Sequence, residues 1–128
     1  MRIISFMPLN RKFKLWLPVL VWAGIIFTFS SLSINQPAPF NWLDFIVKKT
    51  AHVTEYAIFY FLVWRGWSNA GRFTDKSILW KSLLVTLIYA MSDEWHQTII
   101  PGREGTLRDI GFDTIGMLLA LNQIKKNL

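Results

Sequence analysis

Most of the residues that could do chemistry lie in two short segments. KTAHVTEY spans residues 49–56 and SDEWHQTIIPGREGTLRDIGFD spans residues 92–113, and together they hold six of the eight acidic residues and both histidines. Acid–base catalysis requires two carboxylates in different environments, one buried and one held ionised beside a cation. Glu55 and Glu94 are the candidates for these catalytic roles. No serine or threonine is marked as a nucleophile, so the sequence leaves enzymatic activity open.

Histidine and carboxylate side chains are also the usual ligands of zinc, manganese and iron. The spacing His52-x-x-Glu55 is a weak signal for such a site, and the chain has no His-Glu-x-x-His motif. It also has no cysteine, which excludes a thiolate site. We therefore expect neither a metal nor a cofactor, with both histidines hydrogen-bonded to neighbouring acids.

The Pro-Gly-Arg turn at residues 101–103 indicates a different chemistry. A guanidinium on a tight turn, next to the N-terminus of a helix, suits a phosphate or a carboxylate. A lipid phosphate, a polyprenyl-phosphate carrier or the carboxylate of a peptidoglycan stem would fit Arg103. In the alternative, Arg103 and Arg108 only neutralise neighbouring acids, namely Glu94, Asp109 and Asp113, and fix the last helical hairpin.

The elements that position these residues are expected to be membrane helices. Hydrophobic residues make up 52% of the 128 residues and aromatic residues 16%, which is typical of a membrane protein. Residues 15–43 contain no charge, and their apolar part, 15–32, is long enough to cross about 30 Å of hydrocarbon. Three further helices are expected at 43–67, 78–99 and 107–124. We predict one all-α domain over residues 1–128, with four transmembrane helices.

The first apolar run also resembles the core of a cleavable secretory signal, because basic residues precede it and Ser31-x-Ser33 follows it. Its length and the oily segments that come after it favour an uncleaved helix.

Lysines and arginines predict the orientation. With four crossings and both termini in the cytoplasm, ten of these residues lie inside and four outside, in the direction of the positive-inside rule. This distribution accounts for the net charge of +6 without nucleic acid. The outer residues are Lys48, Lys49, Arg103 and Arg108.

The same orientation brings most acids to the outer half. Spacings of three or four residues place polar side chains on one face of each of the last three helices. At 1.5 Å per residue, Glu55, Asp93 and Asp113 lie at similar depth, within about 10 Å of the outer interface. Charges at that depth require partners or water, so we expect a shared polar pocket that opens outward. The three faces comprise Lys48, His52, Glu55 and Phe59; Tyr89, Asp93 and His96; and Asp109, Asp113, Gly116 and Ala120.

These motifs resemble the VanZ-like family of small bacterial membrane proteins over about residues 15–122. The pattern is a Lys-x-x-His-x-x-Glu-Tyr block, then an acid and Gln, then Pro-Gly-Arg, then Asp with Asn and Gly downstream. One position departs from it, because Asp113 stands where the family commonly has Asn. The resemblance implies a multi-pass membrane protein, and members have been linked to reduced susceptibility to teicoplanin-type glycopeptides and to envelope stress. The matching residues are Lys49, His52, Glu55, Tyr56, Glu94, Gln97, Pro101, Gly102, Arg103, Asp109 and Gly116.

The resulting hypothesis is a cell-envelope membrane protein whose outward pocket binds an anionic lipid or a peptidoglycan-related ligand. One alternative is a membrane enzyme that acts on a lipid or carrier headgroup, and another is a structural or interaction protein. The sequence leaves the oligomeric state open. The predicted ligand-binding residues are Lys49, His52, Tyr56, Gln97, Arg103, Asp109 and Asp113.

Overall fold

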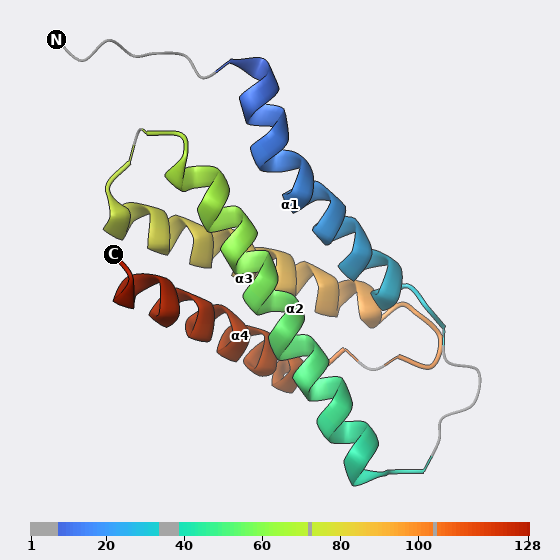
Figure 1. Ribbon diagram of the computed structural model, residues 1–128. Coiled ribbons are helices and arrows are strands. Elements are labelled where there is room, and N and C mark those ends of the chain that lie inside the picture. Colours follow the sequence, from blue (N-terminus) through green and yellow to red (C-terminus); the bar gives the residue numbers. More distant parts are fainter. Residues whose placement is uncertain (1–7, 34–38, 72, 104) are drawn as a thin grey trace, which may run out of the picture.

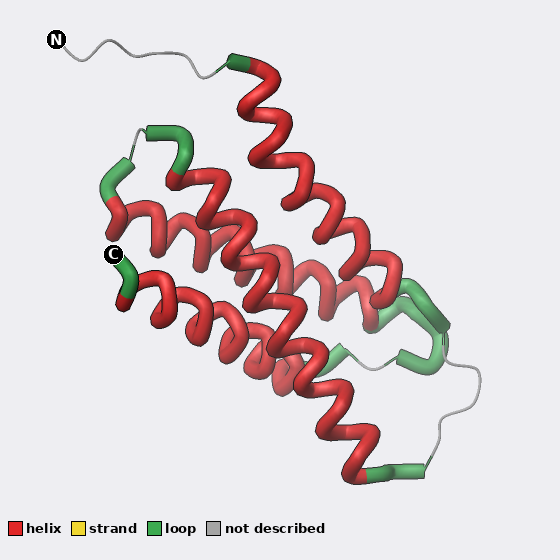
Figure 2. The backbone as a smooth tube through the Cα atoms, in the orientation of Figure 1, coloured by secondary structure: helices red, strands yellow, loops and turns green. Residues whose placement is uncertain are grey.

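A computed structural model describes residues 8–33, 39–71, 73–103 and 105–128. Over these residues the chain forms four helices and no strand, which confirms the all-α prediction (Figures 1 and 2). The helices are α1 (Leu9–Ser30), α2 (Trp42–Ser68), α3 (Asp75–Gln97) and α4 (Leu107–Lys126). The predicted bounds of the last three helices agree with these to within a few residues.

The first helix begins earlier than predicted, at Leu9 instead of residue 15, and ends at Ser30. Hydropathy marks the apolar stretch, whereas the preceding lysines and arginine are good helix formers and extend the helix. Pro18 lies inside α1 and cannot donate to the carbonyl of Lys14 four residues earlier. The guanidinium of Arg65 on α2 donates to that carbonyl at 3.4 Å, so α2 compensates for part of the lost helical bond.

Side-chain caps define where the other helices begin. Asn41 accepts a hydrogen bond from the backbone of Leu43 at the start of α2. Thr74 and Thr106 do the same for the first turns of α3 and α4, each at 3.3 Å. Such caps satisfy backbone N–H groups that have no partner inside the helix.

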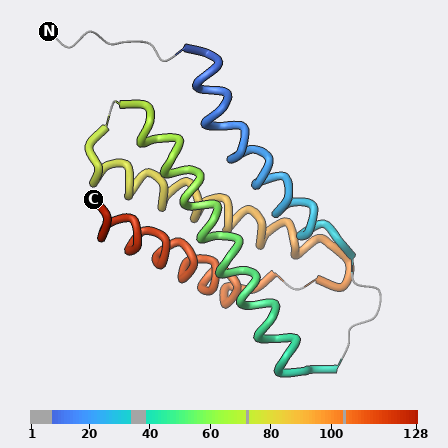
Figure 3. The backbone as a smooth tube through the Cα atoms, in the orientation of Figure 1, coloured from blue at the N-terminus to red at the C-terminus, as the bar shows by residue number. Residues whose placement is uncertain are grey.

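The helices run alternately up and down, so the chain reverses direction at each connection (Figure 3). α2 contacts each of the other three helices and packs most extensively on α4. The start of α1, the end of α2, the start of α3 and the end of α4 lie at one end of the bundle, which we call the basic end (Figure 1). It carries Arg11, Lys12, Lys14, Arg65, Lys76, Lys81, Lys125 and Lys126.

Gly116 permits the close packing of α4 on α2. A Cβ atom at this position would collide with the backbone carbonyl oxygen of Val53. Gly116 therefore allows the two helices to approach closely below the acids.

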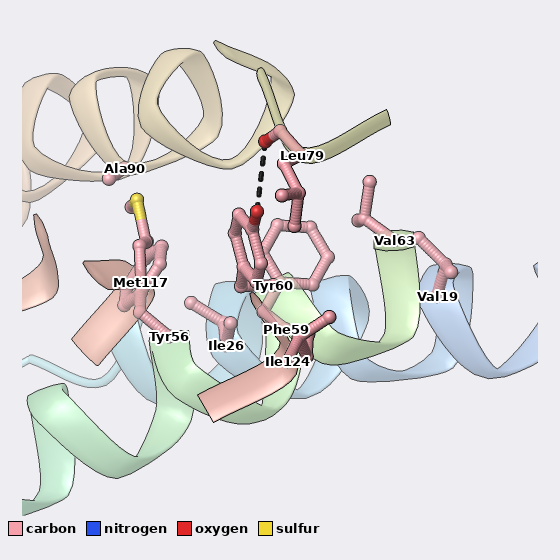
Figure 4. Close-up of a cluster of buried hydrophobic side chains, with 10 residues drawn as sticks. All are labelled: Val19, Ile26, Tyr56, Phe59, Tyr60, Val63, Leu79, Ala90, Met117 and Ile124. Carbon is pink, nitrogen blue, oxygen red and sulfur yellow. Dashed lines mark hydrogen bonds between the residues drawn. The ribbon is translucent and has the colours of Figure 1, made fainter. Parts of the chain in front are cut away.

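The apolar core lies between this contact and the basic end. Tyr60 and Val63 of α2 are fully buried there, together with Met117 of α4. The hydroxyl of Tyr60 donates to the backbone carbonyl of Leu79 on α3 at 2.8 Å, as Figure 4 shows. Packing and buried hydrogen bonds such as this one therefore hold the core together.

The outer faces of the helices are also apolar. The fully exposed positions in the middle of each helix, over residues 17–29, 50–61, 84–95 and 111–123, include no charged residue. Among the described helices, α1 is the one that is long and apolar enough throughout to cross a membrane, by length and composition alone. The other three combine apolar outer faces with polar residues that point inward.

Candidate functional site

A cavity of about 520 Å³ lies between α1, α2 and the turn that joins α3 to α4. Its wall combines three cationic side chains with three carboxylates, and α1 adds apolar residues. We call this region the cavity end, because it lies opposite the basic end. The lining residues are Ile26, Phe29, Ser30, Asp44, Lys48, Lys49, Ala51, His52, Glu55, Gln97, Gly102, Arg103 and Asp109.

Two neighbouring lysines have different environments in this wall. Lys48 pairs with Asp44 one helical turn earlier at 2.8 Å, and the two side chains are 61% and 55% exposed. Lys49 pairs with Asp109 of α4, and these side chains are only 15% and 10% exposed. The ammonium group of Lys49 also lies 5.4 Å and 5.6 Å from the ring centres of Phe45 and Phe112. Lys49 therefore joins α2 to α4, whereas Lys48 remains available at the surface.

His52 forms the second connection between α2 and α4. Its Nδ1 atom lies 2.8 Å from Oδ1 of Asp113, whose side chain is fully buried. The other carboxylate oxygen of Asp113 is buried and has no hydrogen-bond partner among the described residues. The pair thus provides a hydrogen-bond partner for only one of the two oxygens of this carboxylate.

Asp93 of α3 is held by neutral donors. The hydroxyl of Tyr56 donates to its Oδ2 atom at 3.2 Å, and the amide of Gln97 donates to the same atom at 3.5 Å. The Gln97 amide also reaches the hydroxyl of Ser30 on α1 at 3.3 Å. This network connects three helices below the cavity.

Glu94 fixes the turn between α3 and α4. Its Oε2 atom accepts the backbone N–H of Thr106 at 3.1 Å, while Oε1 is buried without a partner among the described residues. A Cβ atom at Gly105 would collide with the backbone carbonyl of Glu94, so the turn lies directly on α3.

Arg103 caps the end of α1. Its Nε atom donates to the carbonyl of Leu32 at 2.9 Å, and Nη2 donates to the carbonyl of Phe29 at 2.8 Å. The last carbonyls of a helix have no partner within the helix, so a guanidinium satisfies them well. In the described part of the chain, neither Arg103 nor Arg108 forms an ion pair with an acid. The alternative in which these arginines neutralise Glu94, Asp109 and Asp113 therefore has no direct contact among the described residues to support it.

Two residues predicted to share the face of Asp93 point toward α1 instead. The hydroxyl of Tyr89 donates to the carbonyl of Ala23 at 2.5 Å. His96 stacks on Phe27 with 4.7 Å between ring centres, and its Nε2 atom lies 3.0 Å from the hydroxyl of Ser31. The inward face of α3 is wide enough to contact both α1 and α2, and α1 packs on the side of this face that carries His96.

The structure brings most of the predicted residues together at the cavity end. Six of them line the cavity: Lys49, His52, Glu55, Gln97, Arg103 and Asp109. The other three, Tyr56, Glu94 and Asp113, are buried behind the wall and hold it through hydrogen bonds.

The contribution of α1 was missed by sequence reasoning. The sequence presents this helix as a plain membrane anchor, yet Ser30 at its end and the next residue, Ser31, contact Gln97 and His96 respectively. The signal was the pair of hydroxyl residues at the end of an otherwise apolar run.

Fold and site together define a class of protein: a small antiparallel four-helix bundle with an apolar exterior and a polar cavity at one end. The chain matches the profile of the VanZ/LLP1 family over residues 13–124 and belongs to this family. A search of curated proteins and a search of solved structures each found no match.

Proposed function

We propose that this VanZ/LLP1 protein is a four-span protein of the bacterial cytoplasmic membrane that binds the anionic headgroup of a lipid or lipid-linked carrier from the outer side. The observation that carries the proposal is the composition of the cavity wall. Beside its three carboxylates, the wall contains the cationic side chains of Lys48, Lys49 and Arg103 and the apolar residues Ile26 and Phe29 of α1. A ligand that is both anionic and apolar matches this combination.

The exterior of the bundle supports four membrane spans. The helices contain between 20 and 27 residues, and a helix of 20 residues is about 30 Å long, which equals the hydrocarbon thickness of a bilayer. Their exposed middle faces are uncharged. Polar residues lower the overall hydropathy of α2, α3 and α4, but the buried ones, such as Ser82, Asp93 and Asp113, lie inside the bundle, where they do not meet lipid. Exposed large apolar residues include Leu20, Val21, Ile58, Phe61, Leu84, Ile88, Met91, Ile115, Leu118 and Leu119.

The distribution of cations supports the orientation. Among the described residues, eight lysines and arginines lie at the basic end and four at the cavity end. The positive-inside rule therefore favours a cytoplasmic basic end and a cavity that faces outward.

Labelling of single cysteines tests this orientation, since the chain has no native cysteine. We expect Ser33→Cys at the cavity end to react with a membrane-impermeant maleimide in intact cells. Asn69→Cys at the basic end should react only after permeabilisation. The reverse pattern would exclude an outward cavity.

Lipid retention tests the ligand. Native mass spectrometry of the purified protein should show retention of phosphatidylglycerol or undecaprenyl phosphate in preference to phosphatidylcholine. Lys48→Gln should weaken that retention severalfold, because Lys48 is exposed and forms only a surface pair that contributes about 1 kcal/mol or less to folding. Lys76→Gln, the same change at the basic end, is the matched control.

An excess of inorganic phosphate distinguishes the two sources of the anion. It should not displace the lipid, because it lacks the apolar part that α1 would contact. Equal retention of anionic and zwitterionic lipid would overturn the proposed function, as would equal loss in both lysine variants. A change in teicoplanin susceptibility on expression is a secondary readout that ligand binding predicts.

A second candidate function is catalysis on the bound headgroup. It is favoured by Glu55, which lines the cavity and has no side-chain hydrogen bond within the described ranges. Glu94 does not line the cavity and accepts a backbone bond, so its part in such a reaction is less direct. If Glu55→Gln and Glu94→Gln keep the phenotype while Lys48→Gln removes it, acid–base catalysis is excluded and binding remains.

A further inference from the structure

We propose that His52, Glu94 and Asp113 bind a divalent transition-metal ion at the floor of the cavity end. Each residue offers one ligand atom, and the three atoms lie within 4.8 Å of one another. The residues come from α2, α3 and α4, so an ion here would join all three helices. The proposal does not depend on the lipid ligand, because it rests on a different set of side chains.

The first argument is the unmet hydrogen-bonding capacity of buried carboxylates. Within the described residues, Asp93, Glu94 and Asp113 each have one buried oxygen without a partner, and two of these residues belong to the proposed site. Asp113 is fully buried and Glu94 is 4% exposed, and each retains one buried oxygen without a partner in the described residues. Buried polar atoms are nearly always satisfied, because a carboxylate oxygen removed from water without a donor is costly. One cation between these side chains would satisfy both oxygens.

The second argument is the balance of charge. Four carboxylates are buried at this end: Asp93, Glu94, Asp109 and Asp113. Lys49 contacts Asp109 and His52 contacts Asp113, but the guanidinium of Arg103 is directed at backbone carbonyls instead. The buried cluster is therefore short of positive charge, which a divalent ion would supply.

The donor set selects the type of ion. One imidazole nitrogen with two carboxylate oxygens suits Zn²⁺ or Mn²⁺, whereas Mg²⁺ and Ca²⁺ favour oxygen ligands alone. Ligands of a tetrahedral zinc ion lie about 3.4 Å apart, as bond lengths of about 2.0–2.2 Å require. Small side-chain rotations from the observed spacing would reach this value. Because His52 also lines the cavity, an ion has a path to the site, and a coordination position remains for water or a ligand.

The simpler account is that His52 and Asp113 form only a hydrogen bond. That bond, 2.8 Å long, provides a partner for one ring nitrogen of His52 and one carboxylate oxygen of Asp113. It leaves the second oxygen of Asp113 and Oε1 of Glu94 unexplained, and it gives no reason for Glu94 to be buried beside the pair.

Metal loading of the full chain tests the proposal. The protein is purified in detergent without a polyhistidine tag, stripped with EDTA, and then titrated separately with ZnCl₂ and MnCl₂. We expect about one equivalent of one of these ions to remain after desalting, measured by elemental mass spectrometry, and Tm to rise on its addition. Absence of both bound metal and a shift in Tm in the wild-type protein would overturn the proposal.

Variants locate the ion. Asp113→Asn, Glu94→Gln and His52→Asn should each weaken metal binding by at least about 100-fold, because loss of a direct ligand should exceed the 10–100-fold effect of supporting residues. Asp75→Asn, an exposed carboxylate at the basic end, is the matched control and should bind as the wild type does. Unchanged binding in all three site variants would place the metal elsewhere. If one variant fails to fold, the remaining two and the wild-type titration still decide the question.

Discussion

The two halves of this bundle are held together in different ways. Toward the basic end, α2 and α4 contribute buried apolar side chains such as Val63 and Ile124 to the core, and Tyr60 of α2 donates one hydrogen bond to a backbone carbonyl of α3 (Figure 4). At the cavity end, the same two helices are joined by the pairs Lys49–Asp109 and His52–Asp113.

The difference indicates what each half is for. Apolar packing stabilises a bundle with no need for special geometry, whereas buried ion pairs often contribute less than apolar residues of the same volume. A surrounding lipid or detergent phase does not lower the free-energy cost of burying such charges. Apolar packing therefore accounts for the stability of one half, and under the proposed function the charges of the cavity end are retained for the ligand.

The largest expected effect comes from Lys49→Met. It leaves the carboxylate of Asp109 buried without its cation, and breaking a buried pair typically costs about 3–5 kcal/mol of unfolding free energy. The double variant K49M/D109L should recover most of this loss, because the charge is removed from both partners. Chemical denaturation in detergent, followed by tryptophan fluorescence, measures both values.

The neighbouring lysine is the control for this experiment. Lys48→Met removes the same charge from an exposed pair and should cost less than about 1 kcal/mol. Equal costs for the two lysines would remove the contrast between the surface and the buried pair. A stable double variant that no longer retains anionic lipid would sharpen the contrast between the two halves.

Gly116→Ala tests the contact that separates the halves. The added methyl group meets the carbonyl oxygen of Val53, which is backbone and cannot rotate away, so we expect a loss of about 1–3 kcal/mol. Gly111→Ala, on the same helix with open space around its Cβ position, should be neutral or stabilising by up to about 1 kcal/mol. Similar Tm values for the two variants would mean that the helices are not in such close contact.

Two tyrosines compare the halves directly. Tyr60→Phe removes a bond to a neutral carbonyl and should cost about 1 kcal/mol, whereas Tyr56→Phe removes a bond to the carboxylate of Asp93 and should cost about 1.5–3 kcal/mol. Both side chains are fully buried, so the difference reports the charge of the acceptor. The reverse order of unfolding free energies would contradict the view that charge dominates the cavity end.

The smallest expected effect is the loss of a helix cap at either end. Thr74→Ala at the basic end should lower the unfolding free energy by about 1 kcal/mol. Thr106→Ala should cost somewhat more, because fraying of α4 also disturbs the backbone bond to Glu94. Thermal unfolding of both variants side by side measures the two effects. A larger effect of Thr74→Ala than of Thr106→Ala would contradict the proposed link between the turn and the site.

Much of the fold could be predicted from the sequence. Apolar runs, prolines and cap residues located the helices, and their periodicity placed His52, Glu55 and Asp113 on inward faces. The prediction failed where hydropathy was used as a measure of helix length, as at the start of α1. The pattern of polar positions placed Lys48 on the face of His52 and Glu55, whereas in the structure Lys49 pairs with Asp109 and Lys48 stays exposed. Lys49 was among the predicted site residues only through the family resemblance.

Only the tertiary structure decided which partner each side chain takes. Lys48 and Lys49 are alike in sequence. Because successive residues in a helix are about 100° apart, Lys48 faces the surface whereas Lys49 faces Asp109. Arg103 contacts the carbonyls of α1, because α1 lies against the turn, and periodicity within one helix contains no information about that neighbour. The grouping of His52, Glu94 and Asp113 likewise depends on how each of three helices is rotated about its axis and shifted along it, so that the three side chains meet. Local periodicity gives a face, whereas packing between helices sets the distances on which binding depends.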